Sequence, residues 1–109
     1  VEGAASKLSY IEVLNAQHFD AFIDNAAFPG YDSRYVPLHY YFIQAMDRMW
    51  ANLAQGTALP PSQVVRTTPR GGTPEAAPAI TRANVPPIAT APLASDVITF
   101  SSSTLTIPD

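Results

Sequence analysis

The sequence predicts an α/β fold, of which these 109 residues form only a part. Three observations predict it. Residues 8–14 read as a buried strand, and helical apolar spacing follows them. A longer helical pattern then runs to Gly56, and its apolar face is broader than one strand and one short helix can cover. Beyond Leu59 the composition changes to Pro, Ala and Thr, which is typical of an extended segment.

The composition excludes several classes of protein. The six Lys and Arg residues are scattered and the net charge is −3, so we expect no nucleic-acid partner. No apolar run approaches the roughly 20 residues that a membrane helix needs, and we expect no membrane span. The absence of cysteine excludes thiol catalysis and Cys-ligated zinc. Because the sequence starts at Val1 without a targeting signal, we expect any such signal to lie upstream or to have been removed.

The first elements are a strand and a short helix. Residues 8–14 are rich in β-formers and nearly continuously apolar from Tyr10, which favours a parallel strand covered on both faces. Asn15 can then act as an N-cap, which places His18 in the first turn of the helix. The predicted buried stripe of this helix consists of Phe19, Phe22, Ile23 and Ala26.

The second helix follows a turn at the Pro29-Gly30 pair. Pro37 suits its first turn, and Gly56 suits the left-handed position beyond its last turn. We expect Trp50 to be a core residue, and we expect the surface that covers this helix to come from an upstream part of the same protein. The apolar face consists of Leu38, Tyr41, Phe42, Ala45, Met46, Met49, Trp50 and Leu53.

Proline divides the rest of the chain. Nine of the eleven prolines follow Leu59, and residues 58–96 are expected to wrap a surface in extended form. Residues 97–109 are expected to form a short β tail, in which 97–100 and 104–107 pair as a hairpin or join a sheet edge. Residues 62–67 are a third candidate strand.

Five long and compositionally unusual strings run through most of the chain. They are IEVLNAQHFDAF (11–22), PGYD (29–32), VPLHYYFIQAMD (36–47), LPPSQVVRTTPRGG (59–72) and ITRANVPPI (80–88). Together they resemble a stretch near the C-terminus of the D-(−)-3-hydroxybutyrate oligomer hydrolases. Members of that family are much longer than this chain.

The resemblance implies a serine esterase, similar to the α/β-hydrolases, that cuts 3-hydroxybutyrate oligomers to monomers in polyhydroxybutyrate breakdown. Residues 1–57 would then end the catalytic domain. The serine and its acid are expected on the missing upstream part, so the chain alone is expected to be inactive. No metal or organic cofactor is implied. The family suggests either a secreted or periplasmic location or the bacterial cytoplasm.

His18 is the predicted catalytic residue. In α/β-hydrolases the triad runs Ser, then Asp or Glu, then His along the chain, and a C-terminal part should keep only the histidine. His18 lies four residues past Leu14, outside a predicted strand end, where sites in open α/β sheets form. His39, at the start of the long helix, is the alternative base and is otherwise expected to be a buried or hydrogen-bonded structural residue.

Other polar residues have simpler expected roles. His18 and Asp20 have the spacing of an HxD metal pair, but one histidine and one carboxylate cannot complete a site, and we expect no metal. Asp20 and Asp24 are expected to be solvated carboxylates on a helix face. The arginines that could bind the carboxylate end of an oligomer, and are otherwise solvated, are Arg34, Arg66 and Arg70.

A different class of function also fits the pattern. The chain could be a non-catalytic interaction module, whose aromatic helix docks a partner and whose proline-rich stretch adopts a polyproline II conformation. Such a module should fold cooperatively by itself, whereas a part of a larger fold should expose its apolar face and aggregate.

Overall fold

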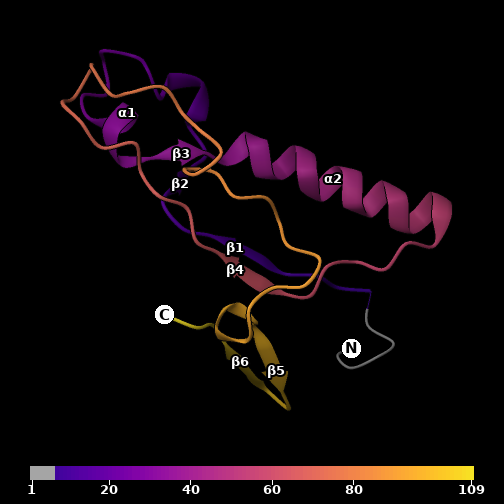
Figure 1. The fold of residues 1–109 in the computed structure, drawn as a ribbon. Coiled ribbons are helices and arrows are strands. Elements are labelled where there is room, and N and C mark those ends of the chain that lie inside the picture. The colour runs from indigo at the N-terminus through magenta and orange to yellow at the C-terminus, as the bar shows by residue number, and fades with distance from the viewer. Residues whose placement is uncertain (1–6) are drawn as a thin grey trace.

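The computed structural model describes residues 7–109, in which one long helix lies along one side of the strands (Figure 1). None of the described helices is long and apolar enough to cross a membrane. The strands and helices are β1 (Ile11–Val13), β2 (Ala16–Gln17), η1 (Asp20–Phe22, a 3₁₀ helix), α1 (Tyr31–Arg34), β3 (Val36–Pro37), α2 (Leu38–Gln55), β4 (Gln63–Val65), η2 (Ala94–Asp96, 3₁₀), β5 (Thr99–Ser101) and β6 (Thr104–Thr106).

β1 and β4 form a parallel pair, and α2 lies between them in sequence and beside them in space (Figure 1). The register places Glu12 opposite Val64. The Leu14 N–H donates to the Val65 carbonyl at 3.1 Å, which extends the ladder by one bond. The predictions of a parallel strand within residues 8–14 and of a strand within 62–67 are therefore confirmed.

The predicted helix after Asn15 is wrong. Asn15 has φ +54° in the left-handed region, and its side-chain amide donates to the Thr67 carbonyl at 3.1 Å instead of capping a helix. The chain turns there into β2, which pairs in parallel with β3. Only the 3₁₀ turn at η1 remains of the expected helix. Of its four predicted core residues only Ile23 is buried, whereas Phe19 and Phe22 are exposed and so is Ala26.

α2 has the predicted bounds. Its N-cap is Pro37, and Gly56 ends it at φ +70° with an N–H that donates to the Asn52 carbonyl at 3.0 Å. Its burial differs from the prediction, because Tyr41 is the only buried residue of the helix. Trp50 is 68 % exposed, so within residues 7–109 it is not a core residue. The exposed large apolar side chains of this helix are Phe42, Ile43, Met46, Met49, Trp50 and Leu53.

The later part of the proline-rich segment packs against β3, α2 and β4. Val85 and Ile88 join the core formed by Val36, Tyr41 and Val65. The Tyr41 O–H donates to the Pro86 carbonyl at 2.9 Å. Burial and the neighbouring Tyr40 raise the pKa of Tyr41 to about 12, so this donor keeps its proton at neutral pH.

The last residues form an antiparallel hairpin. β5 pairs with β6, and Phe100 lies opposite Leu105. Ser102 occupies the left-handed region at φ +53° in the connecting turn. The expected hairpin is therefore formed, and the residues before it also join a sheet edge: Val97 forms an antiparallel bridge with Gln63 of β4, and the Ile98 N–H donates to the Ser62 carbonyl at 2.9 Å.

Candidate functional site

The two histidines lie at the same end of the β2–β3 pair, just beyond the last residues of both strands. The register places Gln17, the last residue of β2, opposite Pro37, the last residue of β3. His18 directly follows one strand and His39 lies two residues beyond the other. Because the strands are parallel, both histidines are at the carboxyl ends of strands, where sites in α/β folds form. His18 thus lies in a turn between β2 and η1, not in the first turn of a helix.

Asp20 ties the two histidine segments together. Its Oδ2 accepts the backbone N–H of His39, which is one of the unpaired donors of the first turn of α2. Pro37 has no side-chain acceptor for this end of the helix, so the cap comes from a residue distant in sequence. Asp20 is therefore not the solvated carboxylate that was predicted. A long helix without Ser, Thr, Asp or Asn at its start is the signal by which the sequence could have revealed a remote cap.

Both histidine side chains are exposed. The His18 ring lies 4.0 Å from the Phe19 ring, centroid to centroid, and the His39 ring lies 5.9 Å from that of Phe42. Among residues 7–109, neither imidazole makes a hydrogen bond. His39 is therefore not buried, and the hydrogen bond that it makes uses its backbone N–H and not its imidazole. The described residues provide neither a nucleophile nor an acid in contact with His18.

The arginines bond within the chain. Arg70, whose side chain is 7 % exposed, donates through Nε to the Asp32 carbonyl at 2.7 Å and pairs with Asp24 at 2.6 Å. Asp24 is therefore paired, and Arg70 is not a solvated arginine as predicted. In the other two cases, Arg34 donates to the Gly30 carbonyl at 3.0 Å and Arg66 pairs with Asp96 at 2.8 Å. Within residues 7–109, each of the three arginines thus already has a hydrogen-bond or ion-pair partner.

Asp32 is a buried carboxylate that no sequence pattern distinguishes. It is 6 % exposed, and its Oδ2 accepts the Ala77 N–H at 3.1 Å. Burial by itself raises the pKa of Asp32, but hydrogen bonds from the backbone of Ala77, Glu75 and Ser33 and the charge of Arg70 outweigh it and hold the pKa below its usual value. Asp32 thus fastens the 75–77 loop to α1 as an ionised group.

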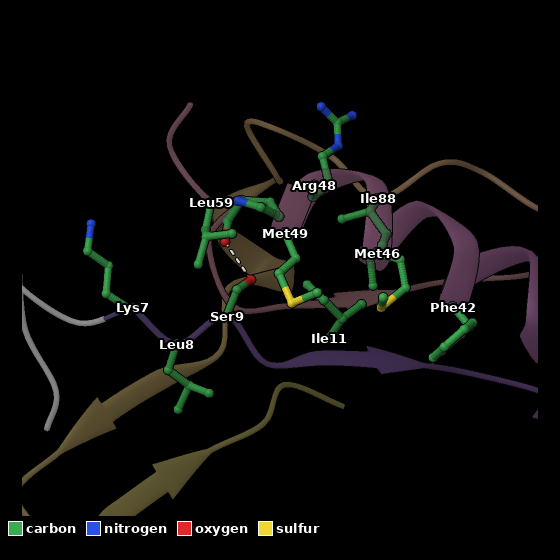
Figure 2. Close-up of a pocket in the computed structure, with 12 residues that line it drawn as sticks. Lys7, Leu8, Ser9, Ile11, Phe42, Met46, Arg48, Met49, Leu59 and Ile88 are labelled. Atoms are coloured by element: carbon green, nitrogen blue, oxygen red, sulfur yellow. Dashed lines mark hydrogen bonds between the residues drawn. The ribbon is translucent and has the colours of Figure 1, made fainter. Parts of the chain in front are cut away.

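One apolar cavity lies away from the histidines. It has a volume of about 280 Å³ and opens between α2 and the start of β1 (Figure 2). The Ser9 hydroxyl donates to the Pro60 carbonyl at 2.6 Å on its wall. No group of three metal-binding side chains occurs within residues 7–109. The apolar lining of the cavity includes Leu8, Ile11, Phe42, Met46, Met49 and Ile88, but neither histidine.

Comparison with known proteins covers the whole chain. A family model described as 3HB-oligomer hydrolase matches residues 1–109. Relatives named D-(−)-3-hydroxybutyrate oligomer hydrolase include that of Paracidovorax citrulli, 64 % identical over 110 residues, with 100 % of this chain and 16 % of the relative covered. The relative from Polaromonas naphthalenivorans is 65 % identical over 109 residues, with 100 % of this chain and 15 % of the relative covered. No solved structure matches.

The chain therefore spans only about a sixth of the length of these curated relatives. Its match to the family model nevertheless extends from the first residue to the last. The chain belongs to the 3HB-oligomer hydrolase family.

Proposed function

We propose that this chain is the C-terminal part of a serine esterase with an α/β-hydrolase-like fold, which cleaves 3-hydroxybutyrate oligomers to monomers. The observation that carries the proposal is the family match over all 109 residues. The names of the relatives supply the substrate class. The parallel pair β1–β4 and the connecting helix α2 are elements that such a fold would contain.

His18 is the general base of the proposed reaction. Its support is its position, since it directly follows β2, is exposed and makes no hydrogen bond within residues 7–109 that would occupy its ring nitrogens. The serine and the acid come from the upstream part of the protein, in the chain order of α/β-hydrolase triads. His39 lies at the same end of the β2–β3 pair and remains the alternative base.

The chemistry follows from a neutral imidazole at His18. The imidazole takes the proton of the serine hydroxyl as the serine oxygen attacks the ester carbonyl. It then gives that proton to the alkoxide oxygen of the departing 3-hydroxybutyrate unit, which leaves as an alcohol. A water molecule, deprotonated by the same imidazole, next attacks the acyl-enzyme. The imidazolium returns this proton to the departing serine oxygen, and the second product is released as an acid. The upstream carboxylate holds the other ring nitrogen and fixes the tautomer. No metal or organic cofactor takes part.

Substitution of the histidines in the full-length protein tests this assignment. We expect His18→Ala to lower kcat for 3-hydroxybutyrate dimer hydrolysis by about 10⁴-fold or more, as loss of a triad base does. His39→Ala is the matched control, because the hydrogen bond from His39 to Asp20 uses the backbone and survives the change. Chromatographic assay of released monomer gives both rates. Loss of activity in His39→Ala but not in His18→Ala would move the base to His39.

The non-catalytic interaction module is the second candidate, and the exposed apolar side chains of α2 favour it. The proline-rich stretch that such a module would also use fits this function less well. The proline-rich stretch packs against its own chain through Val85 and Ile88, and its carbonyl at Pro86 is engaged by Tyr41, so little of it is free to bind a partner. The chain alone is expected to be inactive in either case, because the proposed nucleophile and acid lie outside it.

A further inference from the structure

β1 has one paired edge and one unpaired edge within the described residues. The Tyr10 carbonyl accepts the Gln63 N–H at 2.9 Å, and the Leu14 N–H donates to Val65, so the even-numbered residues of this strand turn their backbone groups toward β4. Backbone groups of successive strand residues point to opposite edges. The N–H and C=O groups of Ile11 and Val13 therefore face away from β4, and within residues 7–109 no strand pairs with them.

An apolar surface on α2 lies beside this strand. Phe42 and Ala45 line two hollows together with Ile11. One of the two, drawn in Figure 2, continues to Met46 and Met49. The exposed apolar residues of α2 extend from Phe42 to Leu53, a distance of about 16 Å at the rise of a helix. Contiguous apolar surface of this extent marks a site of contact with another surface.

The β1–β4 pair is also smaller than the parallel sheets that occur in folded proteins. Parallel strands occur almost only in larger sheets that are covered on both faces. The β1–β4 pair has α2 on one side, but both the β1 edge and much of α2 are uncovered within the described residues. The missing partner must supply a strand and apolar side chains together.

We propose that a segment preceding Val1 in the full-length protein covers this surface, adding a strand to the β1 edge and apolar side chains to α2. Curated relatives are more than six times as long as the chain, so enough sequence lies outside it. The cavity beside α2 is lined by Lys7, Leu8 and Ser9, where the described chain begins. The last residue of the chain does not line this cavity, and its carbonyl accepts a hydrogen bond from Arg66, just beyond β4. The cavity therefore favours a segment that joins the chain before Val1. This proposal concerns assembly of the fold and does not depend on the esterase chemistry.

Amide hydrogen exchange of the full-length protein, resolved to single residues, tests the strand. The amides of Ile11 and Val13 should exchange at least about 100-fold more slowly than unstructured amides, as buried hydrogen-bonded groups do. Glu12 and Leu14 are matched controls in the same strand, because their amides are already bonded to β4. Rapid exchange at Ile11 and Val13 beside slow exchange at Glu12 and Leu14 would overturn the proposal.

Methionine oxidation tests the apolar face in the same protein. Met46 and Met49 are each 44 % exposed here, and in the full-length protein both should react with hydrogen peroxide about 10-fold or more slowly than in the urea-unfolded protein. Mass spectrometry of the peptide that carries both residues gives the rates. Oxidation as fast as in the unfolded protein would contradict the proposal. Protection that disappears on dilution would identify a second copy as the occupant and would also overturn it.

Discussion

Asp20 decides, at the scale of single residues, how the candidate site is held. Its carboxylate accepts the His39 N–H and compensates the positive end of the α2 dipole, while its own segment carries His18 two residues earlier. The turn of His18 and the start of α2 are thus fixed to each other by one charged hydrogen bond. The HxD spacing therefore reflects a helix cap, and no third metal-binding side chain accompanies it within residues 7–109.

Asp32 should give the protein an acid-sensitive loop. Because its pKa in the folded state lies below the usual value of 3.8, the ionised carboxylate contributes stability that is complete well above pH 3.8 and is lost as the pH falls through the folded-state pKa. We expect Asp32→Asn to reduce stability at pH 7 and to flatten the loss of stability between pH 5 and 3. Urea unfolding of the full-length protein at several pH values measures this. If Asp32→Asn lost stability between pH 5 and 3 as steeply as the wild-type protein does, Asp32 would not be the group responsible for this loss.

At the scale of elements, β4, α2 and the proline-rich segment are joined by polar side chains. Gln63 is 2 % exposed, donates to the Pro61 and Ala89 carbonyls at 2.9 Å each and accepts the Ala89 N–H at 2.9 Å. Gln44 accepts the Ile88 N–H at 3.1 Å from the helix side. A segment too rich in proline to pair as a strand is held in this way without a ladder.

Gln63→Leu should loosen this segment. The change leaves the Ala89 N–H and two carbonyls without their partner, at a cost of about 1 to 3 kcal/mol for a buried unsatisfied group. We expect the Ala89 amide to exchange about 5- to 150-fold faster in the full-length protein. Gln55→Leu, the same change at an exposed position, should have no such effect. Unaltered exchange at Ala89 in Gln63→Leu would show that the side-chain bonds do not hold the segment.

The elements differ in how far the sequence could predict them. The bounds of α2 follow from local signals, since a 3.6-residue period, Pro37 and Gly56 act within the helix itself. The absence of a helix after Asn15 depends on its bond to Thr67, which is 52 residues away and leaves no trace in the local pattern. The same holds for the parallel register of β1 and β4.

At the scale of the whole molecule, the breadth of the α2 face was the most informative sequence feature. It predicts a covering surface outside the first elements, but it does not predict which of the apolar residues stay exposed within residues 7–109. Tyr41 is buried because the returning segment at Pro86 and Ile88 reaches it, whereas Trp50 lies beyond the reach of that segment. The candidate site, too, is predictable from the sequence only in part. His18 and its strand-end position follow from the sequence, but within residues 7–109 no side chain forms a hydrogen bond with its ring.

The isolated chain and the full-length protein should respond in opposite directions to a charge on the α2 face. In the isolated 109 residues, exposed Met46, Trp50 and Leu53 should bind the dye ANS and promote aggregation, and Trp50→Lys should reduce both by breaking the apolar patch. In the full-length protein the same substitution would put a charge against a covering surface and should lower the melting temperature.

Gln55→Lys is the control, because Gln55 is exposed and lies outside the patch, and it should change neither protein. A soluble isolated chain with a sharp cooperative melt and no dye binding would contradict this expectation, because it would mean that α2 needs no cover and would favour the interaction module over a part of a larger hydrolase.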